Sequence, residues 1–249
     1  MLTFVRRLIV VALAVTCSIA VAAPEKFSDA QTLSRWITYY YVSPQPQRVG
    51  EAIRAASSKG FMNEGKNAPP FIGFVAGALH KTPAIAPSLV ETLGSLRKAD
   101  QPVVILGIWY SGHPQAKDIL QRLSKSRPAH KELIARLLAN APLGVLDLPL
   151  EQGPWVLDTL WGYFMATGDD APVARIITAL PWVNVRGDVP RLLVGGAARW
   201  SLVSNAIQHE RVMAVCRKEA ASSSREDARR VLAEVIATAE KEMKEGKTR

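Results

Sequence analysis

Groups that carry enzyme chemistry are scarce in this sequence. Its 249 residues include two cysteines, and its four histidines are far apart with no partner at metal-ligand spacing: His80, His113, His130 and His209. The sequence contains no G-x-S-x-G, H-E-x-x-H, P-loop or paired-cysteine motif. It therefore predicts no catalytic residue, no metal site and no cofactor.

A hydrophobic run long enough to cross a membrane is also missing. Residues 1–22 have a charged start, a short apolar stretch and a small-residue cleavage site: Arg6-Arg7, Leu8 to Val15, and Ala20-Val21-Ala22. The apolar stretch is shorter than the ~20 residues of a spanning helix, which argues against an uncleaved anchor. The pattern is typical of a signal peptide cleaved after Ala22. We expect an exported protein, periplasmic or secreted.

Export permits disulfides, but the sequence offers none within the exported chain. Cys17 lies in the predicted signal peptide, and Thr16 before it is a poor match to the very small residue that precedes a lipidated cysteine. Removal of the signal peptide leaves Cys216 as the one cysteine, and it shares an apolar face with Val212 and Val215. We expect Cys216 to be buried rather than a nucleophile. About 225 residues remain, enough to bury a core without cross-links.

Sustained strand-like alternation is lacking as well, and nearly every segment has a helical period. Residues 155–180 are the clearest case, with one apolar stripe before a turn and another after it. Gly168 is placed to end the first helix, and Asp169 or Asp170 to cap the second. Pro172 falls in the first turn, where its missing N–H is tolerated. This stretch predicts a helical hairpin.

Two further segments, residues 33–56 and 105–123, repeat this form around Pro- or Gly-bearing turns. Their spacing is irregular, so the sequence predicts an all-α fold built as an irregular, superhelix-like stack of antiparallel hairpins. The hairpins resemble those of tetratricopeptide-type repeat proteins in general form, which implies stacked helix pairs that bind partner segments. The segment LWGYFMATGDDAPVARIITAL also resembles hairpins of small exported bacterial proteins of uncharacterised function, and brings no catalytic residues.

The longest stretch without a helical period, residues 144–154, is a predicted connection between two lobes. The lobes are residues 23–145 and 146–249, the second with a charged tail from Lys241; one continuous domain over 23–249 is the alternative. In the second lobe, Asp188 is placed to cap a helix with the apolar stripe Leu193, Trp200, Val203 and Ile207. Gly195-Gly196 within it costs about 1 kcal/mol per glycine relative to alanine. Close packing of a neighbouring helix against the bare backbone would explain the pair.

Three tyrosines are the most specific binding candidates. Tyr39, Tyr110 and Tyr163 come from the first helices of the three hairpins, and Tyr39 and Tyr163 lie off the inward stripes. Aromatic residues with polar ends often line binding grooves. If the three point outward from neighbouring helices, they form a row on one face. Core packing between hairpins is the alternative.

His113, in the turn Gly112-His113-Pro114, is the remaining candidate. A hydrolase site assembled from scattered residues such as His113 and Asp158 is one alternative function. Asp158 with Asp169 and Asp170 could also form a carboxylate cluster for acid–base work or a hard cation. However, the helix that follows the turn needs an acid at its N-cap. This requirement explains Asp169 or Asp170 without any role in metal binding or catalysis.

The formal charge of +9 falls to +7 when Arg6 and Arg7 leave with the signal peptide. Such a balance could favour an anionic membrane or glycan. The basic residues are spread along the chain without the aromatic interleaving of a nucleic-acid module, so no nucleic-acid partner is expected. The sequence favours an exported all-helical binding or scaffold protein that engages another protein, with the hydrolase and the peripheral anionic-surface binder as alternatives.

Overall fold

The computed structural model describes residues 27–62, 67–222 and 224–246; the predicted signal peptide, residues 1–22, lies outside this part. The described residues form twelve α-helices and no strand, which confirms the all-α prediction. The helices are α1 (Ala30–Thr38), α2 (Val49–Ser58), α3 (Ala68–Lys81), α4 (Ala86–Thr92), α5 (Gln101–Tyr110), α6 (Ala116–Ser126), α7 (Lys131–Leu138), α8 (Trp155–Thr167), α9 (Asp170–Ile177), α10 (Val189–Gln208), α11 (Glu210–Ser222) and α12 (Glu226–Gly246).

Short 3₁₀ helices fill most of the connections. They are η1 (Tyr40–Val42), η2 (Pro46–Arg48), η4 (Pro83–Ile85), η5 (Leu93–Ser95), η6 (Lys98–Asp100), η7 (Pro128–His130), η8 (Val145–Asp147), η9 (Leu150–Gln152) and η10 (Leu180–Asn184). The charged tail from Lys241 forms the last part of α12, which continues to Gly246.

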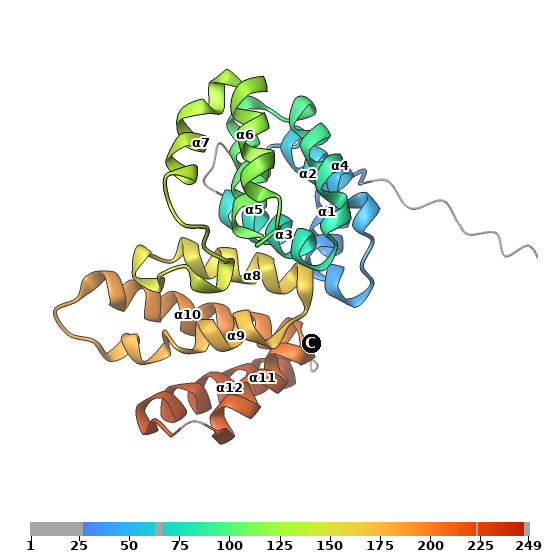
Figure 1. Ribbon diagram of the computed structural model, residues 1–249. Coiled ribbons are helices and arrows are strands. Elements are labelled where there is room, and N and C mark those ends of the chain that lie inside the picture. Colours follow the sequence, from blue (N-terminus) through green and yellow to red (C-terminus); the bar gives the residue numbers. More distant parts are fainter. Residues whose placement is uncertain (1–26, 63–66, 223, 247–249) are drawn as a thin grey trace, which may run out of the picture.

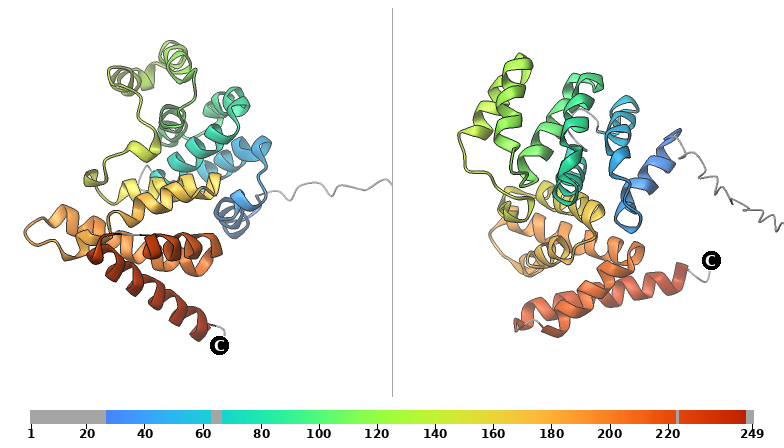
Figure 2. Two further views of the ribbon diagram at one scale, coloured as in Figure 1. Left: turned by 60° about the horizontal axis from the view of Figure 1, so that its bottom comes forward. Right: turned by 45° about the vertical axis from the view of Figure 1, so that its right-hand side comes forward.

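The helices are arranged as an irregular stack of hairpins, as predicted. α8 lies across the middle of the molecule, with α1 to α7 on one side and α9 to α12 on the other (Figure 1). The second view of Figure 2 shows the helices of the first half side by side in chain order. The three predicted hairpins are present as α1/α2, α5/α6 and α8/α9.

Local signals set the ends of these helices. The Asp29 carboxylate accepts a hydrogen bond of 2.7 Å from the backbone N–H of Thr32 and so caps α1. Gly168 ends α8 with a left-handed φ of 65°, a conformation that glycine adopts at little cost. Gly168 thus acts as the sequence predicts.

The acids after Gly168 act differently from the prediction. Asp169 occupies the N-cap position of α9, but its carboxylate makes no capping bond and instead pairs with Lys81 of α3 at 2.9 Å. Asp170 pairs with Arg211 and Lys218 of α11, at 3.1 and 3.6 Å. The turn acids therefore connect α9 to helices distant in sequence, because basic side chains of those helices lie within reach.

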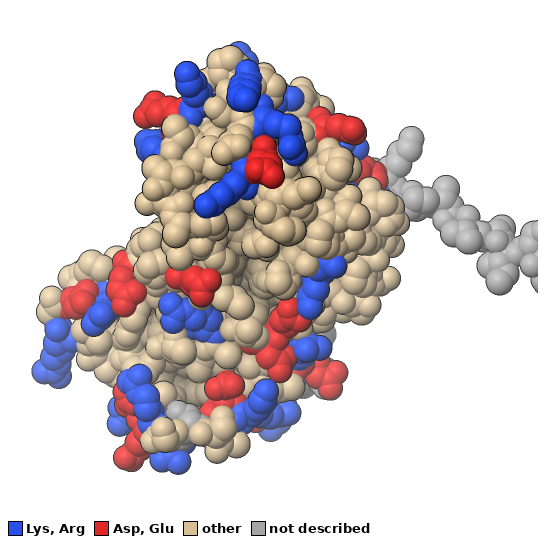
Figure 3. Space-filling model, viewed as in Figure 1, with Lys and Arg blue, Asp and Glu red and all other residues tan. Residues whose placement is uncertain are grey.

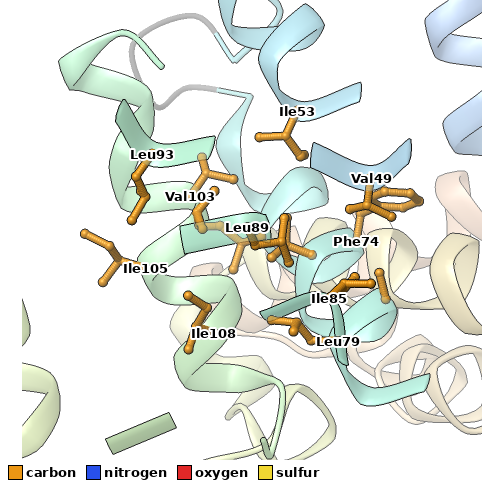
Figure 4. Close-up of a cluster of buried hydrophobic side chains, with 14 of the residues drawn as sticks. Val49, Ile53, Phe74, Leu79, Ile85, Leu89, Leu93, Val103, Ile105 and Ile108 are labelled. Carbon is orange, nitrogen blue, oxygen red and sulfur yellow. The ribbon is translucent and has the colours of Figure 1, made fainter. Parts of the chain in front are cut away.

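Buried side chains form two clusters. One lies among α1 to α7 and includes Phe74, Leu89 and Ile108 (Figure 4). The other lies among η8 to α12 and is centred on residues such as Phe164 and Leu202. The clusters meet where α3 and α8 cross, and each helix contributes to both. The division into lobes 23–145 and 146–249 stays a prediction.

Glycines allow α3 and α8 to touch along their backbones, in the most extensive helix–helix contact of the described chain. A Cβ atom on Gly73 of α3 would overlap the carbonyl oxygen of Thr159 in α8. A Cβ on Gly162 of α8 would overlap the carbonyl oxygen of Pro70 in α3. Only glycine permits this approach at either position. These two glycines therefore allow the close contact between α3 and α8 at which the two clusters meet.

Candidate functional site

The three candidate tyrosines do not form an exposed row. Tyr163 is only 6% exposed and its ring lies 5.9 Å from that of His80. Burial, together with the nearby Asp169 carboxylate, raises the pKa of Tyr163 to about 12. Tyr110 is half-buried and packs against both clusters. The outward orientation that the row required is absent at Tyr163, where the alternative of core packing holds, because α8 lies in the middle of the molecule and is covered by α3.

Tyr39, the residue after α1, faces solvent with 42% of its surface exposed. Its ring lies 5.2 Å from that of His209, the buried residue that follows α10. His209 also contacts Phe164, and its Nδ1 is 3.2 Å from the hydroxyl of Tyr41. Burial lowers the pKa of this histidine. The cluster packs the first hairpin against α8 and α10.

His113 and Asp158 have separate surroundings. Nδ1 of His113 accepts a 3.1 Å hydrogen bond from the backbone N–H of Gln115, so the ring stabilises the turn before α6. Asp158 keeps an exposed side chain on α8, and desolvation by its neighbours raises its pKa. Within the described chain no hydrogen bond or ion pair joins these two residues. The hydrolase alternative therefore lacks an assembled pair.

A metal cluster is equally without support in residues 27–62, 67–222 and 224–246, where no group of three or more His, Cys, Asp or Glu side chains could hold an ion. Cys216 is buried, as predicted, and burial raises the pKa of its thiol to about 12. A thiol of that pKa is protonated at neutral pH, which disfavours a nucleophilic role.

Among the described residues, large exposed apolar side chains concentrate on α10, which has two apolar faces. Its inner face consists mainly of small residues and packs on η10, α11 and α12: Val194, Gly195, Ala198, Ser201, Leu202 and Ala206. Its opposite face carries larger side chains around one glycine. We call Val189, Leu192, Leu193, Gly196 and Trp200 the outer stripe, because they follow one another at helical spacing on the side away from the core.

The outer stripe is open to solvent. Trp200 is 74% exposed, Val189 62%, Leu193 59% and Leu192 43%. Val203 and Ile207 continue the stripe in half-buried positions. An apolar helical stripe normally faces the core, but Leu193 and Trp200, the first half of the stripe noted in the sequence, face outward. Helical periodicity reveals an apolar face without showing which of two such faces is buried.

The adjacent glycines explain which face turned inward. A Cβ on Gly195 would lie 2.5 Å from the backbone nitrogen of Val183 in η10, so the close packing that we suggested for this pair is present at Gly195. The neighbour is a 3₁₀ segment rather than a helix. At Gly196 close packing is absent, since apart from the adjacent residues and backbone of α10 itself no atom of the described structure lies within 4 Å of the position a Cβ would take. The small inner face lets η10 approach the backbone, whereas Trp200 and Leu193 are too large for such an approach.

Ion pairs flank the outer stripe. Arg199 pairs with Glu234 of α12 at 3.2 Å. Arg191 pairs with Glu151 at 3.4 Å and with Asp188 at 3.7 Å. The charges beside the stripe are thus balanced by nearby opposite charges. An apolar centre with a satisfied polar rim is the usual anatomy of a protein–protein interface.

Comparison with models of known protein families, with curated proteins and with solved structures finds no match. Among the described helices none is both long enough and apolar enough to cross a membrane.

Proposed function

We propose that this chain is an exported, all-helical binding or scaffold protein that engages another protein molecule through the outer stripe of α10. The observation that carries the proposal is the solvent exposure of four large apolar side chains in one helical row. Contiguous apolar patches on soluble proteins commonly mark interaction sites. Trp200 is also of a residue type that is enriched among the residues that dominate binding energy.

The charge around the stripe favours a protein over an anionic membrane as the occupant. A helix that adsorbs to anionic lipid carries uncompensated Lys and Arg beside its apolar face. Here Arg191 and Arg199 are both paired with carboxylates. Such pairs lower the attraction to lipid head groups and suit the polar rim of a protein interface.

A photo-cross-linking residue at position 200 tests the proposal in cells that export the chain. We expect a discrete protein adduct from position 200 and none from position 143, where Leu143 is also apolar and exposed but lies outside α10. Replacing Leu192 and Leu193 by serine in the cross-linking chain should lower the adduct yield, because loss of central apolar contacts weakens binding by about tenfold or more. Equal adducts from positions 200 and 143 would contradict the proposal.

Export is part of the same proposal and has its own test. The pattern of residues 1–22 supports cleavage after Ala22. N-terminal sequencing of the chain from a periplasmic or culture fraction should begin at Ala23. Recovery of an uncleaved chain in the cytoplasmic fraction would contradict export.

A second candidate surface is the end formed by α6 and α7. Lys and Arg side chains outnumber the acids Asp118 and Glu132 there (Figure 3): Lys117, Arg122, Lys125, Lys131 and Arg136. This favours contact with an anionic membrane or glycan. Binding to vesicles rich in anionic lipid should then fall sharply between low salt and ~0.15 M salt, since screening acts over ~8 Å there. The pair Lys125→Gln and Lys131→Gln should weaken it, whereas Trp200→Ser should not.

A further inference from the structure

We propose that the protein molecule that covers the outer stripe is a second copy of this chain, with the two α10 helices antiparallel and crossing at Gly196. This inference rests on the proposed use of the outer stripe and names its partner. It follows from the order of residues along the stripe, from their size at the crossing point and from the charges beside them.

The stripe is nearly symmetric about Gly196. Leu192 lies four residues before it and Trp200 four residues after it, while Val189 and Val203 lie seven residues before and after. In an antiparallel pair related by a two-fold axis through Gly196, Leu192 of one copy faces Trp200 of the other. Val189 then faces Val203, so Leu192, Val189 and Trp200 each meet an apolar residue of the other copy. A two-fold dimer requires this kind of self-complementary surface.

Gly196 suits the crossing point itself. It is exposed between large neighbours, and no described atom beyond the adjacent part of α10 lies within 4 Å of the position a Cβ would take. Glycine in an exposed helix interior lowers helix stability, and no compensating contact is present among the described residues. A second helix crossing there would meet bare backbone, as α3 and α8 meet at Gly73 and Gly162. Within this chain, backbone-close helix crossings are made at glycine.

The charges also permit the pairing. Arg199 is the one charged residue on the outer face of α10, three residues after Gly196, and it would face Leu193 of the other copy. Its guanidinium already pairs with Glu234, so its methylene stem is available to cover the leucine. Like charges do not meet across the axis. Self-pairing therefore leaves no unpaired charge at the centre of the contact.

The size of the stripe sets the strength of the dimer. A Trp side chain buries about 150–250 Å² and aliphatic side chains less, so the exposed fractions of the four large residues sum to roughly 400 Å² per copy. Two copies bury about 800 Å², below the ~1,200–2,000 Å² of stable complexes. We expect a reversible dimer with a Kd in the micromolar range.

Sedimentation equilibrium of the full exported chain tests the dimer over a range of about 1 to 500 μM, which brackets a micromolar Kd. The wild type should shift from monomer to dimer across this range. Gly196→Gln should remain monomeric, because its side chain has open space in the monomer but occupies the crossing point. Leu143→Gln, a matched apolar-to-polar change outside α10, should dimerise like the wild type. A wild type that stays monomeric at every concentration would overturn the inference.

Cysteine pairing tests the antiparallel arrangement. A chain with Leu192→Cys mixed with a chain with Trp200→Cys should form a mixed disulfide faster than either chain alone. Cys216 is buried and does not compete. Preferential pairing of Leu192→Cys chains with one another would overturn the antiparallel crossing.

The failure of the dimer can be distinguished from the failure of the proposed function. If the wild type stays monomeric while the cross-linker at position 200 captures a different protein, the dimer is wrong and the proposed function stands. If position 200 captures nothing, both are wrong.

Discussion

At the scale of single residues, Gly195 and Gly196 show how differently two identical neighbours are used. Gly195 lies against the backbone of η10, and Gly196 faces open solvent. Their sequence context is the same, since both lie in the interior of α10. The sequence showed that the pair costs helix stability, but only the packing shows that the cost is offset at one position.

Alanine at these two positions should change stability in opposite directions. Gly196→Ala should raise the free energy of unfolding by up to about 1 kcal/mol, because alanine favours the helix and nothing blocks its methyl group. Gly195→Ala should lower it by about 1–3 kcal/mol, because the methyl group forces η10 away. Urea unfolding at low protein concentration, where self-association does not contribute, measures both. Two changes of the same sign would contradict the packing described for Gly195.

His209 should make the protein less stable in acid. Burial lowers its pKa in the folded state below the ordinary value of 6.5, so the folded chain holds it neutral while the unfolded chain takes up a proton. Its contribution to stability is complete above pH 6.5 and is lost as the pH falls from there toward the folded-state pKa. Urea unfolding at several pH values between 7.5 and 5 should show this loss.

The variant His209→Gln separates this residue from other titrating groups. Glutamine can keep a hydrogen bond to Tyr41 but does not titrate, so the variant should lose less stability over the same pH range. His130 is also buried with a lowered pKa and remains in both proteins, so it cancels in the difference. Identical pH dependence in the variant and the wild type would show that His209 is not responsible.

At the scale of helices and turns, the sequence predicted what local chemistry determines. The hairpins α1/α2, α5/α6 and α8/α9 follow from helical periods interrupted by Pro or Gly turns. The orientation of α10 did not follow, because it has apolar residues on two faces and the choice depends on side-chain size. A signal was present in the small residues Gly195, Ala198 and Ala206, which mark the face that packs closely.

The pairing of α3 with α8 was also beyond a local interpretation, since these helices are far apart in sequence. The spacing Gly73-x-x-x-Gly77 in α3 and Gly162-x-x-x-Ala166 in α8 contained a signal for it. Small residues four apart lie on one side of a helix and let another backbone approach. The three tyrosines form no exposed row for the same reason, because Tyr163 lies on α8 and α3 covers that helix.

Substituting the glycines of this helix pair should be severe. Gly73→Ala or Gly162→Ala places a methyl group on a carbonyl oxygen of the facing helix, which backbone rigidity cannot absorb without separating the helices. We expect each to lower the free energy of unfolding by about 3 kcal/mol or more. Thermal and urea unfolding measure the loss, with Gly196→Ala as the control for the same change at an open helical position. If the free energy of unfolding falls no more than it does for an ordinary surface substitution, the backbone contact between α3 and α8 is contradicted.

At the scale of the whole molecule, two buried clusters share one helix pair. Ala76 of α3 belongs to the second cluster, and Ala166 of α8 belongs to the first. Neither cluster can lose α3 or α8 and keep its packing. The two lobes inferred from the sequence therefore need not behave as independent domains, and their boundary at residues 145/146 has a thermodynamic test.

We expect the described fold to unfold in one cooperative transition. Scanning calorimetry should give a calorimetric enthalpy equal to the van't Hoff enthalpy, as for a two-state protein. Gly162→Ala should lower the temperature of the entire transition rather than split it. Two resolved transitions, with only one of them shifted by Gly162→Ala, would instead establish independent lobes.

The glycine contact between α3 and α8 has a further consequence for amide hydrogen exchange. Amides that open only when the whole fold opens exchange slowest, whereas those near chain ends or surface turns exchange through local fluctuations. The N–H groups around Gly73 and Gly162 lie where two backbones touch beneath both clusters. Their exchange should be the slowest in the chain and should report the global free energy of unfolding. The amides of α10 near Gly196 should exchange more slowly as protein concentration rises, because the second copy then covers them.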